Sequence, residues 1–116
     1  MMRTIYENTP SNQYIKNFSK NQLDEQCKYL WGIVLDLLYK QEAEYPFLDN
    51  RIQSVINIVS GCNTLFCYSP KVITICAHLE KARVDNEQFR KCIMDSLGLI
   101  DELRTEFVLN GGDTYV

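Results

Sequence analysis

The sequence has few of the features that mark several classes of protein. Its 116 residues include one histidine and one tryptophan, and its longest apolar runs are only a few residues. A membrane-spanning helix needs about 20 apolar residues. Twelve Lys and Arg against fifteen Asp and Glu give a net charge of -3, whereas dedicated nucleic-acid binders carry a basic excess. The segment Met1–Asn8 lacks the apolar centre of a secretory signal. We therefore expect a soluble cytoplasmic domain that binds neither nucleic acid nor membrane.

Side chains that support catalysis or metal binding are also few. No two of the five cysteines have the two-residue separation typical of zinc sites. Cys27, Cys76 and Cys92 lie among apolar residues, where a reduced thiol behaves as a small hydrophobe; a Cys62–Cys67 redox pair is the alternative. A single histidine leaves little for acid–base chemistry near neutral pH, and no glycine-rich phosphate loop is present. We expect no enzyme activity, no metal and no cofactor.

Four segments show helical periodicity after a polar N-terminal stretch. They begin at about Lys20, Leu48, Ser69 and Asp85. Apolar residues recur in steps of three and four in each segment, and no hairpin signal or sustained alternating pattern competes. The pattern predicts an all-α fold, an antiparallel up-and-down four-helix bundle. We assign residues 1–19 to an N-terminal arm or short helix, 20–108 to the bundle and 109–116 to a flexible tail.

Local signals predict where these helices begin and end. Tyr45-Pro46 ends the first, because a residue before proline is pushed away from helical angles. Ser69-Pro70 places a capping side chain and a proline at the start of the third. Asp85 and Gln88 have the spacing of a capping box at the start of the fourth, and Asn110-Gly111-Gly112 ends it. Short connections between the helices follow from these boundaries.

The second segment, from about Leu48 to Thr64, carries two different stripes. One is apolar and predicts the side that faces the core. The other is polar, uncharged and mostly small, whereas an ordinary solvated face carries Lys and Glu. Its residues are Gln53, Asn57, Ser60, Gly61 and Thr64. This composition makes the second stripe a candidate partner-binding face.

The stretch that begins at Asn57 resembles the histidine-containing phosphotransfer (HPt) domain. The family pattern is a histidine, two residues, a lysine, a glycine and small residues, then an apolar residue and a second glycine; a later helix carries a leucine–glutamate pair. Gly61 matches the first glycine, Phe66-Cys67 falls on the apolar residue and second glycine, and Leu79-Glu80 matches the pair. The resemblance covers about residues 20–108.

The sequence departs from the family at the positions that carry its chemistry. The phospho-accepting histidine falls on Asn57 and the lysine falls on Ser60. An amide has no nucleophilic ring nitrogen to accept a phosphoryl group, and the missing lysine removes a charge that would stabilise the phosphoryl oxygens. Gly61 remains, and in the family a small residue there lets a receiver domain approach closely. The resemblance implies a pseudo-phosphotransfer adaptor that binds a response-regulator receiver or another signalling protein and modulates phosphorelay signalling.

Two other interpretations stay open at this point. His78, followed three residues later by Lys81, is a candidate phospho-acceptor of an active phosphorelay intermediate. Its apolar neighbours Ile75 and Leu79 favour a structural histidine at the edge of the core instead. The chain is alternatively a small helical partner-binding protein, such as a chaperone or an effector, whose likeness to the HPt domain is architectural alone. A large exposed apolar patch away from Gly61 would favour this last interpretation.

Overall fold

The computed structural model describes the backbone of residues 9–109 and the side chains of residues 20–109. This part of the chain consists of helices and turns, without a strand. Its elements are α1 (Thr9–Glu42), α2 (Leu48–Ser60), α3 (Pro70–Val84), the 3₁₀ turn η2 (Asn86–Gln88), α4 (Phe89–Arg104) and the π-helical turn η3 (Thr105–Leu109). The prediction of an all-α fold with four packed helices is confirmed.

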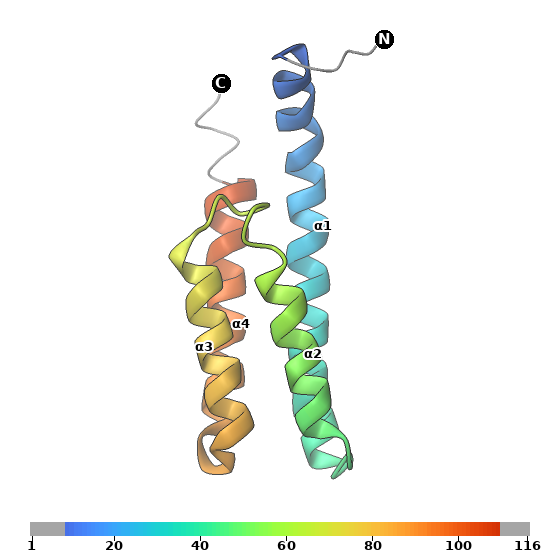
Figure 1. Ribbon diagram of the computed structural model, residues 1–116, viewed down its shortest axis with the longest axis vertical. Coiled ribbons are helices and arrows are strands. Elements are labelled where there is room, and N and C mark those ends of the chain that lie inside the picture. The colour runs from blue at the N-terminus through green and yellow to red at the C-terminus, as the bar shows by residue number, and fades with distance from the viewer. Residues whose placement is uncertain (1–8, 110–116) are drawn as a thin grey trace.

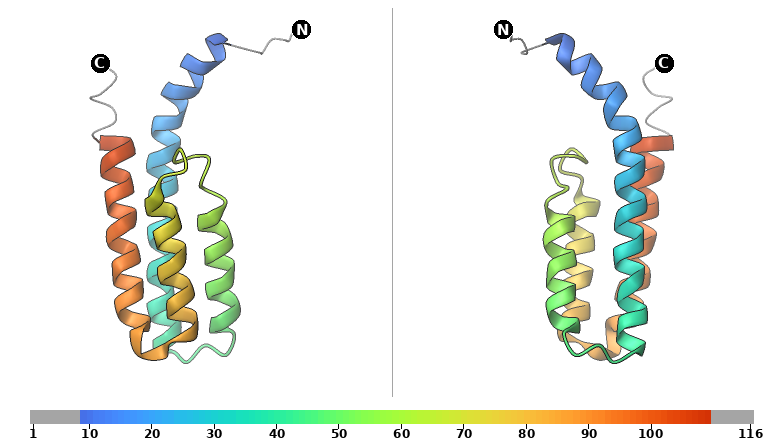
Figure 2. Two further views of the ribbon diagram at one scale, coloured as in Figure 1. Left: turned by 60° about the vertical axis from the view of Figure 1, so that its left-hand side comes forward. Right: turned by 90° about the vertical axis from the view of Figure 1, so that its right-hand side faces the viewer.

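Each of the four main helices packs against two others. α1 and α3 both contact α2 and α4, so α2 and α4 occupy opposite corners of the bundle (Figure 2). The α1–α2 and α3–α4 connections lie at one end of the bundle and the α2–α3 connection lies at the other (Figure 1). Because α2 and α4 occupy opposite corners, their outward surfaces face different sides of the molecule. No helix among the described residues is both long and apolar enough to cross a membrane.

The core runs along the centre of the bundle and takes apolar side chains from every helix. Its largest fully buried members are Leu30, Val34 and Leu37 of α1, Ile52 and Val55 of α2, Ile75 and Leu79 of α3, and Phe89, Ile93, Ile100 and Leu103 of α4. Phe66, from the α2–α3 connection, is also fully buried, and its ring meets that of Phe107 edge-on at 5.5 Å between centroids. Phe66 therefore closes one end of the core, which agrees with its place on the apolar residue of the HPt pattern.

The first helix is longer than its apolar pattern predicts. It begins at Thr9 rather than at about Lys20 and continues without a break to Glu42. Pro10 stands in the first turn, where a proline is tolerated, and no glycine or proline follows before Lys20. Residues 9–19, assigned above to an arm or short helix, carry only Tyr14, Ile15 and Phe18 as large apolar residues, too few to predict that the first helix extends through them. Asn110-Gly111-Gly112 and the rest of the tail to Val116 lie outside the described residues.

The local sequence signals predict some of the other helix ends correctly and place the start of α4 too early. Ser69 caps α3 as predicted, because its Oγ accepts a hydrogen bond from the Lys71 backbone N–H at 3.2 Å and Pro70 is the first helical residue. Asp85 caps the turn η2 through the Glu87 N–H at 3.1 Å, and α4 begins four residues later than predicted, at Phe89. α1 ends before Tyr45-Pro46, as expected. Each capping side chain therefore marks the start of helical backbone. At Ser69 this backbone is an α-helix, whereas at Asp85 it is the 3₁₀ turn that precedes α4.

Replacing Ser69 by alanine tests the cap of α3. The variant Ser69→Ala leaves the Lys71 N–H without its side-chain acceptor, and we expect the free energy of unfolding to fall by about 1 kcal/mol. Ser54→Ala, at an exposed position inside α2, is the matched control and should change stability by less than about 0.5 kcal/mol. Urea denaturation followed by circular dichroism measures both. Equal effects of the two variants would contradict the capping role.

Candidate partner-binding face

The packing of α2 decides which of its side chains reach solvent. Ile52, Val55 and Val59 are buried against the core. The five residues of the polar stripe, Gln53, Asn57, Ser60, Gly61 and Thr64, are all exposed. Only the first three belong to α2, because the helix ends at Ser60 rather than at Thr64 and the chain continues in turns from 61 to 68. The structure thus brings Gln53, Asn57 and Ser60 to one helix face and places Gly61 and Thr64 at its end.

Two side-chain amides are joined at the centre of this face. The Gln53 Nε2 donates a hydrogen bond to Asn57 Oδ1 at 3.1 Å, one helical turn away. The Asn57 backbone carbonyl accepts from the Gly61 N–H at 3.0 Å. The position that a phospho-accepting histidine occupies in the HPt pattern is therefore filled by an exposed, hydrogen-bonded amide. Such a group offers donors and acceptors to a partner but no nucleophilic nitrogen.

Gly61 is not required by the backbone where it stands. Its φ of -66° and ψ of -11° are ordinary right-handed helical angles. A Cβ built on it would meet only the carbonyl oxygens of Asn57 and Ile58, each at 3.4 Å, an ordinary van der Waals separation. Glycine at a helical position is destabilising relative to alanine by roughly 0.5–1 kcal/mol. An exposed glycine without a backbone role leaves space for another molecule to approach the end of α2 closely.

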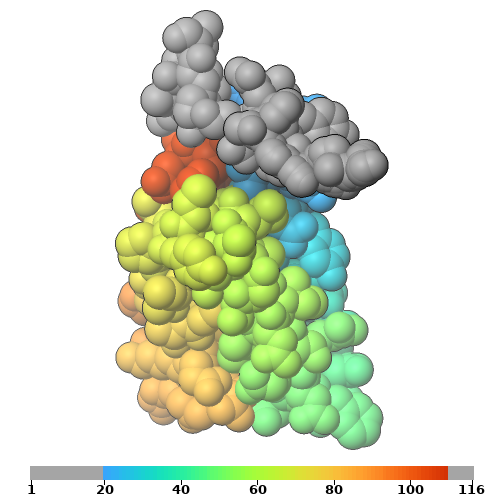
Figure 3. Space-filling model, turned by 45° about the horizontal axis from the view of Figure 1, so that its top comes forward, coloured from blue at the N-terminus to red at the C-terminus, as the bar shows by residue number. Residues whose placement is uncertain are grey.

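The connection after Gly61 contains a backbone feature that periodicity does not predict. Cys67 and Tyr68 have φ values of 55° and 57°, in the left-handed region that favours glycine. Both side chains are exposed, and the connection forms the surface over the ends of α2 and α3 (Figure 3). Thr64 Oγ1 and the Tyr68 hydroxyl lie 3.3 Å apart in a hydrogen bond. Cys67 is the residue that falls on the second glycine of the HPt pattern, so this position has the conformation for which glycine is suited.

Cys62 ties the end of α2 to the first helix. Its Sγ accepts a hydrogen bond from Gln26 Nε2 at 3.3 Å and donates one to the Ile58 carbonyl at 3.4 Å. Burial raises the pKa of the Cys62 thiol, which keeps it protonated. Cys67 is exposed, and all five cysteines are free thiols. The contact between Gln26 and Cys62 is one that the sequence does not reveal, because the two residues lie in different predicted helices.

His78 lies away from the polar stripe. It is half-buried on α3 and lies within electrostatic range of the Asp95 carboxylate on α4. The hydrogen bond from Lys91, at 2.9 Å, is the main cause that lowers the pKa of Asp95, and His78 adds a smaller effect of the same sign. Because α4 lies at the opposite corner of the bundle from α2, a histidine near Asp95 is not brought together with Asn57, Ser60 and Gly61. Among residues 20–109, no group of three or more His, Cys, Asp or Glu side chains is arranged to hold a metal ion.

Comparison with known proteins adds no further assignment. No protein-family model, curated protein or solved structure matches the chain. The features of this chain that bear on function are therefore the polar stripe, with Gly61 at its end, and the conformation of Cys67.

The left-handed conformation of Cys67 predicts that glycine is preferred there. Cys67→Gly removes the steric cost of a Cβ at positive φ and should raise the free energy of unfolding by about 1 kcal/mol. Cys67→Ala removes the thiol and keeps the Cβ, so we expect it to match the wild type within about 0.5 kcal/mol. Urea denaturation of the three proteins under reducing conditions measures the difference. A glycine variant no more stable than the alanine variant would overturn this assignment of strain.

Proposed function

We propose that this chain is a non-catalytic HPt-like adaptor of the cytoplasm that binds a response-regulator receiver domain or a similar signalling protein. Its docking face consists of Gln53, Asn57, Ser60, Gly61 and Thr64. Bound there, it occupies the receiver surface that a working phosphotransfer protein needs and so modulates phosphorelay signalling. The observation that carries the proposal is the left-handed φ of Cys67, at the position of the second glycine of the family pattern.

The proposal includes the antiparallel up-and-down order of helices that HPt domains share. Ion pairs that join opposite ends of neighbouring helices support this order. Asp49, near the start of α2, pairs with Arg83, near the end of α3, at 3.6 Å. Lys71, at the start of α3, pairs with Glu106, just after α4, at 2.9 Å. The hydrogen bond from Gln26, near the middle of α1, to Cys62, beyond the end of α2, fits the same order.

The absence of phosphotransfer follows from chemistry at two positions. Asn57 offers an amide where the family has an imidazole, and Ser60 offers a hydroxyl where it has a lysine. Both side chains are exposed and remain available as hydrogen-bonding groups. Docking needs shape and hydrogen bonds, whereas phosphoryl transfer needs a nucleophile and a compensating charge. The face of α2 meets the first requirement alone.

A matched pair of glycine variants tests the docking face. Gly61→Gln places a long uncharged side chain at the end of α2, where its Cβ fits without a backbone clash, so the fold should stay intact. We expect the affinity for a receiver domain of the same organism to fall by at least about tenfold, because the partner can no longer approach closely. Gly98→Gln is the control: this glycine is exposed on α4, and its added Cβ would meet nothing within 4 Å beyond the backbone of its own helix.

Calorimetric titration of receiver domains into the three proteins provides the measurement. Gly98→Gln should bind as the wild type does. An affinity that Gly61→Gln leaves unchanged, or that Gly98→Gln lowers equally, would contradict the proposed face.

A gain of function tests the register of the HPt resemblance. The double variant Asn57→His, Ser60→Lys restores the imidazole and the lysine on an exposed helix face. We expect it to take up an acid-labile phosphoryl group from a phosphorylated receiver domain, while the wild type takes up none. Phosphate retention on the purified proteins measures this, with His78→Gln added to the double variant to exclude the native histidine. Label on the wild type that His78→Gln removes would instead favour the active phosphorelay intermediate.

A second candidate function is favoured by the exposed aromatic rings at the α1–α2 connection. Tyr45 and Phe47 pack edge-on with centroids 6.1 Å apart, and the Phe47 side chain is 61% exposed. Exposed aromatic residues are common anchors of protein interfaces. This pair supports a general partner-binding protein, such as a chaperone or an effector, whose binding would not involve Gly61. The glycine variants above separate the two functions.

A further inference from the structure

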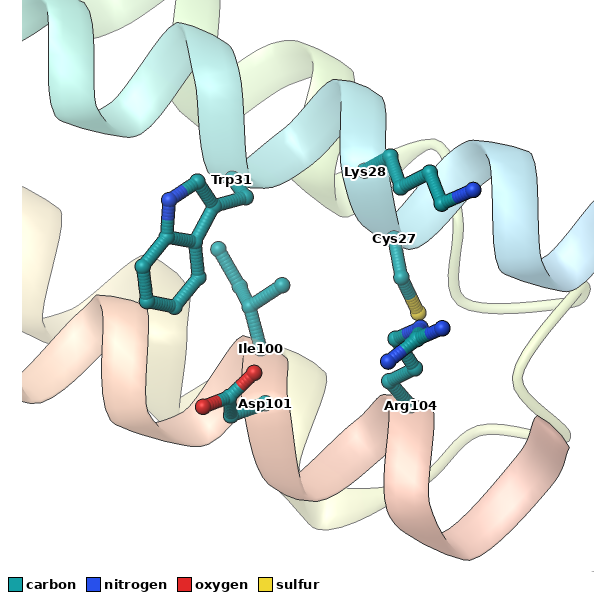
Figure 4. A pocket seen from close by; sticks show the side chains of 6 residues that line it. All are labelled: Cys27, Lys28, Trp31, Ile100, Asp101 and Arg104. Atoms are coloured by element: carbon teal, nitrogen blue, oxygen red, sulfur yellow. The ribbon is translucent and has the colours of Figure 1, made fainter. Parts of the chain in front are cut away.

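A cavity of about 290 Å³ lies between α1 and α4. Cys27, Lys28 and Trp31 line it from α1, and Ile100, Asp101 and Arg104 line it from α4 (Figure 4). α2 packs against α1 and α3 and stands at the opposite corner of the bundle from α4. The cavity is therefore separate from the proposed docking face and is not explained by it.

The cavity has an uncharged floor. Cys27 and Ile100 are both almost completely buried, each with about 1% of its surface exposed. Desolvation by burial is the main cause that raises the pKa of Cys27 to about 11, so its thiol carries no charge near neutral pH. A floor of this kind favours the apolar body of a ligand.

The two ends of the cavity differ in charge. The Trp31 indole and the Asp101 carboxylate lie toward one end, and Lys28 and Arg104 lie toward the other (Figure 4). Arg104 Nε donates to Asp24 Oδ1 at 2.6 Å, and the Lys28 Nζ lies 3.4 Å from Asp24 Oδ2. Lys28 and Arg104 therefore share Asp24 at this end, and the Asp101 carboxylate, which also acts on the charge of Arg104, balances the second positive charge from the Trp31 end.

Arg104 also keeps donors for a further acceptor. Its hydrogen bond within the described part of the chain uses Nε, and a guanidinium carries four more N–H groups on its two Nη atoms. A carboxylate bound to these groups would form a charge-assisted hydrogen bond, which is stronger than a neutral one. The Asp101 carboxylate would repel an anion at the Trp31 end, so a bound anionic ligand has one favoured orientation.

We propose that this cavity is a binding site for a small aromatic carboxylate. The ligand ring lies against the Trp31 indole and Ile100, and its carboxylate accepts hydrogen bonds from Arg104 and Lys28. Stacking on an indole favours an aromatic over an aliphatic body. The volume of about 290 Å³ lies just below the range of ligand sites, roughly 300–1,000 Å³, which limits the ligand to one or two fused rings.

Trp31 makes the test direct, because it is the sole tryptophan of the chain. Its indole N–H gives one resolved signal in a heteronuclear NMR spectrum of the intact protein. Titration with naphthoate should shift this signal saturably, with a Kd on the order of 1 mM for a ligand of this size. Naphthamide, the neutral analogue, should bind at least about tenfold more weakly, since it cannot form the charge-assisted bonds. Equal affinity for both probes, or no saturable shift, would overturn the proposal.

Matched variants assign the effect to the two cations. Arg104→Gln and Lys28→Gln should each weaken naphthoate binding several-fold. The controls are Arg83→Gln and Lys91→Gln, since Arg83 Nε bonds Glu80 at 2.7 Å and Lys91 bonds Asp95 at 2.9 Å, both outside the cavity. Lys28 is largely exposed, so its variant keeps the test valid even if Arg104→Gln fails to fold. Naphthoate binding that the Lys28 and Lys91 variants change equally would contradict the site.

Discussion

The burial of one face of α2 determines which of its side chains reach solvent. Ile52, Val55 and Val59 are at most 2% exposed, and burying each such side chain contributes about 1.5–3 kcal/mol. Because successive residues of a helix turn by about 100°, this burial leaves Gln53 and Asn57 facing outward. Rotating α2 to hide them would expose the apolar residues and bury amides without partners, which is costly. The exposure of the proposed docking face is thus a consequence of core packing, and its chemistry is that of the residues at the outward positions of α2.

The sequence predicts those parts of the fold that depend on neighbours along the chain. Periodicity indicates the four helices and the inward side of α2, and Ser69-Pro70 marks the start of α3, because a cap acts within one turn. Contacts between distant residues stay hidden: Arg104 bonds Asp24, 80 positions earlier, and no local pattern links them. The continuous start of α1 at Thr9 is missed because residues 9–19, assigned to an arm or short helix, carry too few apolar residues to join them to the first bundle helix. For the candidate site, residue types and spacing suffice to select the polar stripe, but the left-handed φ of Cys67 requires the structure.

Docking and phosphoryl transfer make separate physical demands, and the proposed adaptor would meet only the first. In this proposal close approach depends on the small residue Gly61 at the end of α2, whereas transfer would need an imidazole at the position where Asn57 carries an amide. A protein that keeps the first and loses the second competes for a receiver without relaying phosphate. The cavity between α1 and α4 is a second proposed site, on another side of the same bundle. α1 lines this cavity and also packs against α2, the helix that carries part of the proposed docking face.

The most direct measurement is to map the surface that a receiver domain covers. Backbone amide signals of the labelled protein would be followed by NMR as an unlabelled receiver of the same organism is added. We expect the perturbed amides to cluster on the outward side of residues 53–64, with those of α4 unchanged. Perturbations centred on Tyr45 and Phe47, or an unperturbed spectrum with every receiver, would contradict the central claim.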